Sequence, residues 1–519
     1  MPTAGVRRAV ALIFALGCAV AGLFFGESYI GRLPHHQGYF LVPVPDEVHV
    51  PLSTRPRHTL FIVIDGLRRD AAEGMRVTQK LLEHGQCRVS DQGSWTVSRP
   101  VYALLSTGLE VERTGARNNE QTEPLAAESI WQVARAGGLH VSGSSHLPWF
   151  KELFPDGFDH YATGNSHADN VFQATPLVDV NVFHPLYVDE AGHHHGAASA
   201  EYAERVERAD REMAGILEEV RENDLVVFVA DHGHRAQGGH GGAQPEIKDV
   251  LLCFAGLHVA KRTDRAPFDG RSVAPALSLL LGLPFPRHMR AGDDGLDAIF
   301  EVASFGENDR AYVEDRRAAV THFRDVNRAA LEQFIGSAPG TWPRLHAREG
   351  EAQTRRGLMV LAAALIFLGL RLAGAKRRGE RAVVSGAWVV FALFLTWVAH
   401  RVILGDLDFT VINLKIQFVP RAFAVVLLSA LLAGAAHFVT LRRWDQLASD
   451  VLTLLGLVLI ANLGHVFVYG WPLGFPLPGT AARYLPFFGA FVLVGYGLAA
   501  AVLVLVAWRR ARYLGRVAT

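Results

Sequence analysis

Hydrophobic and polar positions divide the chain into three stretches with different periodicities. An apolar run from Ala9 to Phe25 follows two arginines, Arg7 and Arg8. Between about residues 57 and 305, short apolar runs alternate with amphipathic ones, and beyond residue 356 the apolar runs are long. The pattern predicts a hydrophobic N-terminal helix, a folded domain of strands and helices, and a membrane domain.

The short apolar runs of the middle stretch are typical of buried strands. We predict strands at Leu60 to Ile64, Leu225 to Val229 and Val250 to Ala255, and helices at Ala126 to Ala136 and Ala200 to Val220. Such alternation predicts an α/β fold with a mostly parallel sheet flanked by helices. Binding sites in such sheets form at the carboxyl ends of the strands, where Asp65 and Asp231 follow two of the runs.

The last third of the chain contains five apolar segments, each about as long as a membrane span. They cover residues 357–374, 383–403, 421–441, 450–469 and 484–507, and a span needs roughly 20 residues. The N-terminal run reads as an uncleaved anchor, because no convincing cleavage site follows it, and it brings the predicted spans to six.

Basic residues predict the orientation of these spans. They gather on one side, at Arg7, Arg8, Lys376, Arg377, Arg378, Arg381, Arg442, Arg443, Arg509, Arg510, Arg512 and Arg516. The positive-inside rule therefore places both termini in the cytoplasm and residues 27–356 outside it. The predicted parts are an anchor at 1–26, a linker at 27–56, an α/β domain at 57–305, a helical extension at 306–356 and a five-span domain at 357–519.

Composition agrees with this division. Half of the 519 residues are hydrophobic, as expected of a chain with membrane segments, and 51 basic residues balance 51 acidic ones. A neutral chain gives no argument for a nucleic-acid partner. Cys87 and Cys253 can pair outside the cytoplasm, with two unlinked thiols as an equally open alternative. The richness in Ala, Arg, Gly and Val hints at a bacterial source, so we expect a multi-pass protein of the inner membrane with a periplasmic domain.

Carboxylates and imidazoles in separate stretches have the residue types of a two-metal site. Asp189 and His193 are four residues apart, so one helical turn puts both on the same face. We predict that one ion is held by Asp189, His193 and His240, and the other by Asp65, Asp231, His232 and Ser98. Nitrogen and oxygen ligands without thiolates fit Zn²⁺, with Mn²⁺ as second choice. Taken singly, each side chain also suits an ordinary cap, turn or core position; their joint order favours the metal site.

Ser98 is the predicted nucleophile. It precedes Pro100, and a helix is expected from Val101 to Leu105, so Ser98 lies at a helix N-terminus where free N–H groups favour an anion. A serine oxygen and the phosphate that it attacks are both stabilised there. The alternative is that Ser98 only caps the helix.

Four blocks of sequence resemble the alkaline phosphatase superfamily. They are Val63-Ile64-Asp65-Gly66-Leu67-Arg68-Arg69-Asp70, then Ser98-Arg99-Pro100 with Ser106-Thr107-Gly108, then Asp189-Glu190-Ala191-Gly192-His193, and Asp231-His232-Gly233 with His240-Gly241. They most closely resemble the branch of nucleotide pyrophosphatase/phosphodiesterases and glycosylphosphatidylinositol (GPI) ethanolamine phosphate transferases. The resemblance covers residues 58 to about 290 and implies an alkaline-phosphatase-like catalytic domain that uses two divalent ions.

The resemblance also implies a reaction. It suggests a membrane-bound phosphotransferase acting on phosphodiesters through phospho-Ser98, with a phospholipid or lipid-linked substrate. Asn119, or its neighbour Asn118, occupies the position of an amide that holds a phosphoryl oxygen, and we expect Arg99 to contact the substrate as well. Tyr102 stands where sulfatases carry an arginine, which disfavours sulfate ester cleavage. A phosphodiesterase or phosphatase is the alternative enzyme, and a transporter or scaffold with an inactive outer domain is a third possibility.

Polar residues within the predicted spans are further candidates. His400, His437, Asn462 and His465 lie in or near apolar segments, and polar groups in spans are functional candidates by default. Hydrogen bonding between helices is an equally open explanation. The loops 404–420 and 470–483, with Trp471, Pro472, Phe475 and Tyr484, suit the membrane interface.

Overall fold

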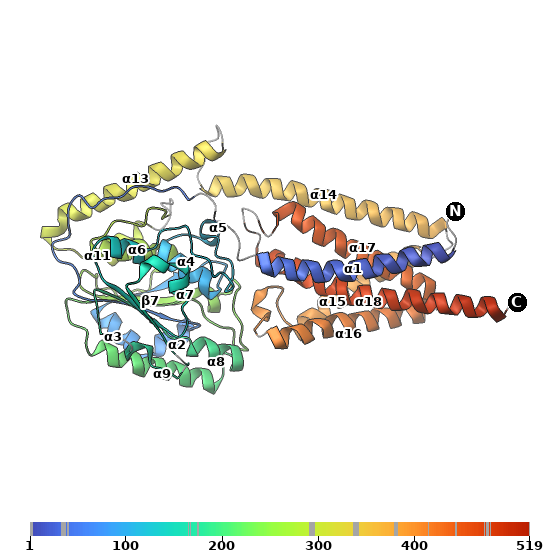
Figure 1. Ribbon diagram of the computed structural model, residues 1–519, viewed down its shortest axis with the longest axis horizontal. Coiled ribbons are helices and arrows are strands. Elements are labelled where there is room, and N and C mark those ends of the chain that lie inside the picture. The colour runs from blue at the N-terminus through green and yellow to red at the C-terminus, as the bar shows by residue number, and fades with distance from the viewer. Residues whose placement is uncertain are drawn as a thin grey trace. The chain divides into compact units, whose positions relative to one another are not determined.

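The computed structural model divides the chain into two compact units (Figure 1). It describes residues 4–32, 38, 41–164, 166, 168–173, 176–289, 296–335, 342–377, 382–413, 415–441, 444–471, 473, 477 and 479–517. Residues 34–346 form the α/β unit, and residues 1–33 together with 347–519 form the helical unit. The finer boundaries expected from the sequence remain predictions.

A mostly parallel sheet forms the centre of the α/β unit, as predicted. Its strands among the described residues are β1 (Thr59–Ile64), β2 (Gly85–Asp91), β3 (Val141–Ser145), β4 (His160–Thr163), β5 (Val180–His184), β6 (Leu225–Ala230), β7 (Asp249–Gly256) and β8 (Pro267–Asp269). Their order is β4-β3-β5-β1-β6-β7-β2-β8. β7 pairs antiparallel with both of its neighbours, whereas the other pairs are parallel.

Helices cover both faces of this sheet. They are α2 (Arg69–Gly74), α3 (Arg76–His84), α4 (Ser98–Thr107), α5 (Val111–Thr114), α6 (Ile130–Ala136), α7 (Trp149–Leu153), α8 (Tyr187–His195), α9 (Ala200–Leu217), α10 (Pro245–Lys248), α11 (Val273–Leu281), α12 (Ala298–Val302) and α13 (Arg310–Ile335). In Figure 1, α4, α6 and α11 lie on one face and α2, α3, α8 and α9 on the other. β1 and β6, at the centre, are buried along their whole length, which explains their unbroken apolar sequence.

Local chemistry moves two helix starts from their predicted positions. The helix expected from Ala126 begins at Ile130, because the Ser129 side chain and Gln132 form a reciprocal capping box. The helix expected from Val101 begins three residues earlier, at Ser98. Ser98 therefore occupies the first turn of α4, and Val97 precedes the helix.

Cys87 and Cys253 form a disulfide that links β2 to β7. The two residues are direct partners in the antiparallel register of these strands, at the fully buried centre of the pair. Cys18 is a free, buried thiol. The disulfide resolves the alternative that the sequence left open.

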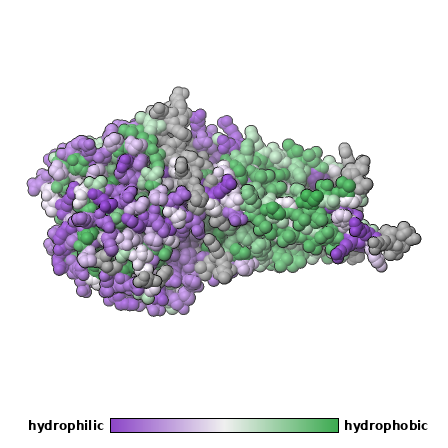
Figure 2. Space-filling model, viewed as in Figure 1, coloured by the Kyte–Doolittle hydropathy of each residue, from purple (hydrophilic) through white to green (hydrophobic). Residues whose placement is uncertain are grey.

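The helical unit consists of long apolar helices. Among the described residues they are α1 (Ala4–Arg32), α14 (Trp342–Arg377), α15 (Ala382–Ile403), α16 (Lys415–Leu441), α17 (Trp444–Tyr469) and α18 (Thr480–Val517). Each of these six is long and apolar enough to cross a membrane, and Figure 2 shows the hydrophobic surface of this unit. The six predicted spans are therefore found.

Small residues bring α1 against α18. A Cβ atom at Gly22 would lie 2.6 Å from the Ala490 carbonyl oxygen, and one at Gly497 would lie 2.9 Å from the Ala15 carbonyl oxygen. Such close backbone approach is typical of helix pairs in membranes. The free ends of α1 and α18 lie at the same end of this unit (Figure 1).

The structure describes only some of the basic residues on which the predicted orientation rests. Arg7 and Arg8 lie near the start of α1, and Arg509, Arg510 and Arg512 near the end of α18, so these five share one end of the unit. Arg378, Arg381, Arg442 and Arg443 lie outside the described residues, as do Pro472 and Phe475 of the predicted interface.

Candidate metal centre

Two neighbouring strands deliver carboxylates to the same edge of the sheet. β1 and β6 are parallel and in register, with Ile64 opposite Ala230, so Asp65 and Asp231 emerge side by side. Both side chains are fully buried. The backbone N–H groups of Gly66 and His232 donate to Asp231 Oδ1 at 3.0 and 2.8 Å. Among the described residues, Asp65 Oδ1 and Asp231 Oδ2 have no hydrogen-bond partner.

His232 connects these carboxylates to Ser98. Its Nε2 atom lies 3.6 Å from Asp65 Oδ1, 3.3 Å from Asp231 Oδ2 and 3.3 Å from Ser98 Oγ. The N-cap position of α4 belongs to Val97, and Ser98 is the first residue of the helix itself, so Ser98 is not the N-cap that the alternative required. Its hydroxyl therefore lies beside the imidazole that contacts both carboxylates.

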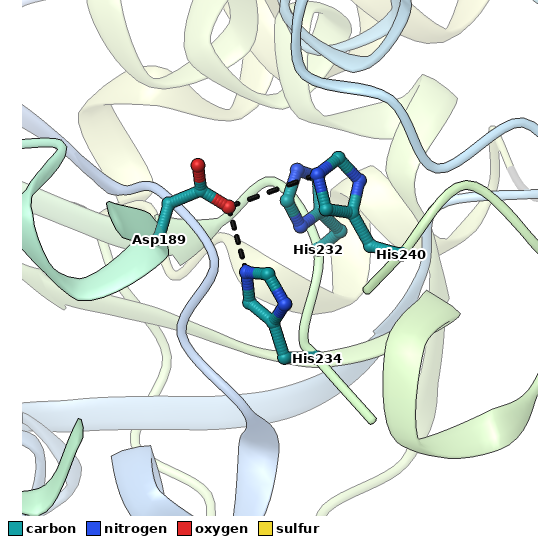
Figure 3. A group of neighbouring side chains, drawn as sticks. All are labelled: Asp189, His232, His234 and His240. Carbon is teal, nitrogen blue, oxygen red and sulfur yellow. Dashed lines mark hydrogen bonds and ion pairs between the residues drawn. The ribbon is translucent and has the colours of Figure 1, made fainter. Parts of the chain in front are cut away.

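A second group of side chains surrounds Asp189, which lies on α8 (Figure 3). His234 Nε2 is 2.7 Å from Asp189 Oδ1, and His240 Nε2 is 3.8 Å from the same oxygen. The rings of His232 and His240 stack with centroids 3.8 Å apart. These four residues place their ligand atoms within 4.8 Å of one another, as do Asp65, Asp231 and His232.

His193 lies at the edge of this second group. Its Nε2 atom is 3.4 Å from Asp189 Oδ2 and 3.1 Å from His240 Nε2. The cluster around Asp189 in which all ligand atoms lie within 4.8 Å of one another contains His234 and not His193, although the sequence reasoning did not assign His234 as a ligand. Its spacing of two from His232 is the signal that was available.

Glycines make the approach of α8 possible. Gly66 has a φ of +71°, and a Cβ atom there would lie 2.6 Å from Asp189 Cα. A Cβ atom at Gly192 would collide with the imidazole of His234. A side chain at Gly66 would displace Asp189, and one at Gly192 would displace His234, so both glycines allow α8 to pack against the segments that follow β1 and β6.

The electrostatics of this cluster favour a bound cation. Burial would raise the pKa of Asp189, but the nearby imidazoles of His193 and His234 hold it well below its usual range. Burial, together with the charge of Asp65, raises the pKa of Asp231 well above its usual range. Burial lowers the pKa of His232 to about 4 and also lowers that of His240. Burial thus keeps His232 and His240 neutral at pH 7, while ionisation of Asp231 beside Asp65 needs positive charge nearby.

These observations fit divalent metal ions. The donors are nitrogen and oxygen atoms, most of them buried, and two carboxylate oxygens lack a hydrogen-bond partner among the described residues. Buried polar groups in native proteins almost always have partners, so orphaned ligand atoms that share one space point to an ion.

Asn119 lies beside Ser98, and Arg99 faces elsewhere. The Asn119 Nδ2 atom is 3.5 Å from Ser98 Oγ, and its Oδ1 accepts from the backbone N–H of Arg99 at 3.0 Å. The Arg99 guanidinium is buried, donates to Glu152 and to the Gln121 carbonyl oxygen, and lies 4.9 Å from the centroid of the Trp149 ring. Its side chain therefore has protein partners in this structure, and contact of Arg99 with substrate stays a prediction.

The neighbouring amide is oriented differently. Asn118 Oδ1 accepts from the backbone N–H of Glu120 at 3.0 Å, within the local turn. Of the two asparagines considered from the sequence, Asn119 is thus the one that contacts the Ser98 hydroxyl.

Tyr102 and His184 both contact Asp65 Oδ2, and the sequence reasoning did not assign either of them to the site. The Tyr102 hydroxyl donates to Asp65 Oδ2 and lies 2.7 Å from His184 Nε2. His184, the last residue of β5, is itself 3.2 Å from Asp65 Oδ2. Burial and the charge of Asp65 raise the pKa of Tyr102 well above its usual range, so its hydroxyl remains a donor. Partners of this kind orient a ligating carboxylate.

Comparison with known proteins adds the family context. A family model described as type I phosphodiesterase/nucleotide pyrophosphatase matches residues 165–238. The catalytic subunit of human GPI ethanolamine phosphate transferase 3 is 26% identical over an alignment of 339 residues that covers 57% of this chain and 30% of that protein. GPI ethanolamine phosphate transferase 1 of Saccharomyces cerevisiae is 34% identical over an alignment of 374 residues that covers 57% of this chain and 38% of that protein. The predicted resemblance is confirmed.

The similarity has a limited extent. The chain spans about a third of the length of these transferases. Among solved structures, murine ectonucleotide pyrophosphatase/phosphodiesterase 5 is 14% identical, with a TM-score of 0.40, and covers 48% of this chain and 100% of its own. Alkaline phosphatase PafA is 12% identical, with a TM-score of 0.39; the match covers 49% of this chain and 100% of PafA.

The position of Tyr102 leads to a first prediction. Tyr102→Phe removes the hydroxyl that holds Asp65 Oδ2, so we expect metal affinity to fall by about 10- to 100-fold, the usual effect of losing such a partner. Competition with a chelator, followed by metal analysis of the full-length protein, measures the change. Tyr161→Phe is the matched control, because Tyr161 is a tyrosine of the same unit whose hydroxyl donates to the Leu147 carbonyl oxygen. Equal metal retention in both variants would contradict the role of Tyr102.

Proposed function

We propose that this chain is a membrane-bound, metal-dependent phosphotransferase that acts on phosphodiesters. The donor is a phospholipid whose headgroup phosphate, such as phosphoethanolamine, is moved to a lipid or glycan hydroxyl. The observation that carries the proposal is the position of Ser98 Oγ, 3.3 Å from His232 and 3.5 Å from the Asn119 amide, at the edge of a cluster of buried carboxylates and imidazoles. The similarity to GPI ethanolamine phosphate transferases supports the class of donor.

Two divalent ions complete the proposed centre. Asp65, Asp231, His232 and Ser98 would hold one ion, and Asp189 and His240 the other, with His193 or His234 as its third ligand. Zn²⁺ suits this donor set best, and Mn²⁺ is the second choice. When bound, such ions supply positive charge that lowers the pKa of the serine hydroxyl and stabilises the phosphoryl oxygens.

Ser98 and Asn119 have different roles in the first half of the proposed reaction. Ser98 Oγ attacks the phosphorus; a bond from Oγ to phosphorus forms as the bond from phosphorus to the lipid oxygen breaks. The proton lost by Ser98 is balanced by the one that the departing lipid alcohol takes up. The Asn119 amide, which lies beside Oγ, donates to a phosphoryl oxygen as negative charge develops there.

The second half of the reaction decides the class of enzyme. A hydroxyl of the acceptor attacks phospho-Ser98, and Ser98 regains its proton as the new ester forms. If water takes the place of the acceptor, the protein is a phosphodiesterase, which is our second candidate. The similarity to named transferases and the six apolar helices of the described chain favour a lipid substrate and transfer.

The orientation is part of the proposal. We place the α/β unit outside the cytoplasm and both termini inside, in the inner membrane if the source is bacterial. The basic residues near the N-terminal end of α1 and the C-terminal end of α18 support this orientation. The Cys87–Cys253 disulfide supports it independently, because disulfides persist mainly in oxidising compartments.

Substitution of Ser98 tests the reaction. We expect Ser98→Ala to lower turnover of a nitrophenyl phosphodiester by at least about 10³-fold, because the attacking oxygen is removed. Ser98→Thr, which keeps a hydroxyl, should retain measurable turnover. Unchanged turnover in Ser98→Ala would overturn the proposed nucleophile.

Labelled donor separates the two candidate reactions. Phospholipid with ³²P in its headgroup phosphate is supplied to membranes that contain the wild-type protein or Ser98→Ala. Ser98-dependent movement of label onto a lipid or glycan supports transfer, whereas Ser98-dependent release of free headgroup phosphate supports hydrolysis instead.

The disulfide tests the orientation in intact cells. Acid quenching, denaturation and alkylation before reduction should label only Cys18, and a second reagent added after reduction should label Cys87 and Cys253. Cys18 is the internal control, because it is a free thiol. Labelling of Cys87 and Cys253 by the first reagent would place the α/β unit in a reducing compartment.

A further inference from the structure

A cavity of about 650 Å³ lies among α14, α15, α17 and α18 of the helical unit. Its walls are mostly apolar, and include Leu393, Trp397, Val458, Leu485 and Phe488. Leu407 and Ala482 also line it, so it lies near the loops at the end of the unit opposite the chain termini. A mostly apolar cavity of this size with a few polar groups is typical of a ligand site.

Asn462 lines this cavity and carries an oxygen atom without a hydrogen-bond partner among the described residues. Its side chain lines the cavity and is 4% exposed, and its Nδ2 atom donates to the Val458 carbonyl oxygen at 2.9 Å. Its Oδ1 atom has no hydrogen-bond partner among the described residues. A Cβ atom at Gly489 would lie 2.6 Å from Nδ2, so α18 packs closely over the amide and fixes its position.

His465 offers a second acceptor from the same helix. Its Nε2 atom is 2.9 Å from the Ala482 carbonyl oxygen, which can only accept, so Nε2 carries the proton. The Nδ1 atom of the neutral ring is then an acceptor, and it has no partner in the described part of the chain. Leaving buried acceptors unpaired costs about 1–3 kcal/mol each, so both favour a ligand that donates hydrogen bonds.

The lack of charged residues in the described lining of the cavity restricts that ligand further. None of its described lining residues is an Asp, Glu, Lys or Arg. A phosphate would find no cation there, and an ammonium group would find no carboxylate; either would lose its hydration without compensation. A hydroxyl group is uncharged and donates a hydrogen bond, so it satisfies both restrictions.

We propose that this cavity binds an uncharged lipid through its free hydroxyl, with Asn462 Oδ1 and His465 Nδ1 as the acceptors. A diacylglycerol has this chemistry. The site stands without any assigned reaction, but its meaning rests on the proposed function: removal of the headgroup phosphate from a glycerophospholipid leaves a diacylglycerol. The cavity would then hold the lipid product of the first half-reaction.

Photo-crosslinking of the full-length protein in phosphatidylcholine nanodiscs tests the site. A diazirine-labelled diacylglycerol should crosslink saturably to α17 or α18, and unlabelled diacylglycerol should compete. Asn462→Leu and His465→Phe should each raise the apparent dissociation constant by about 2- to 12-fold, the equivalent of one net hydrogen bond. Leu463→Phe is the matched control on the same helix, because Leu463 is 53% exposed and does not line the cavity; its binding should equal that of the wild type.

Three outcomes would overturn this site. They are crosslinking that does not saturate, equal binding by Asn462→Leu, His465→Phe and the Leu463→Phe control, and preference for a matched phosphatidylethanolamine probe over the diacylglycerol probe. Ser98→Ala should bind diacylglycerol as the wild type does. Failure of the proposed reaction would therefore leave this binding intact, and failure of binding would leave Ser98-dependent turnover intact.

Discussion

Asp65 and Asp231 lie side by side at the ends of β1 and β6, fully buried and with one oxygen each unpartnered among the described residues. Two carboxylates in such a place repel each other, and burial together with the charge of Asp65 raises the pKa of Asp231. Positive charge between them removes the conflict. The imidazoles of His232 and His240, kept neutral by burial, suit coordination of such a charge.

The fold is arranged to maintain this juxtaposition. Parallel pairing of β1 with β5 and β6 brings three strand ends to one edge, and Tyr102 of α4 joins two of them through its bonds to Asp65 and His184. The same helix presents Ser98 to the cluster at its first turn. The positive φ of Gly66 brings the chain close to Asp189. The helical unit differs, because Asn462 and His465 line a cavity whose described lining residues include no Asp, Glu, Lys or Arg.

The sequence predicts whatever depends on local pattern. Unbroken apolar runs marked β1 and β6, and the carboxylates after them share one edge because parallel strands end together. Contacts set by tertiary packing were out of reach: His234 turns toward Asp189 because Gly192 has no side chain, and His184 is the last residue of its own strand. The contacts of the Arg99 guanidinium with Glu152 and Gln121 were likewise not predictable, because they depend on residues distant along the chain.

Metal content of the purified full-length protein tests the central claim most directly. After purification without chelators and loading with Zn²⁺ or Mn²⁺, the account predicts about two bound ions per chain, and fewer in Asp231→Asn. Binding to the Asp189 group should then persist in that variant. A wild-type protein that retains no divalent ion, under conditions where the chain remains folded, would contradict the account.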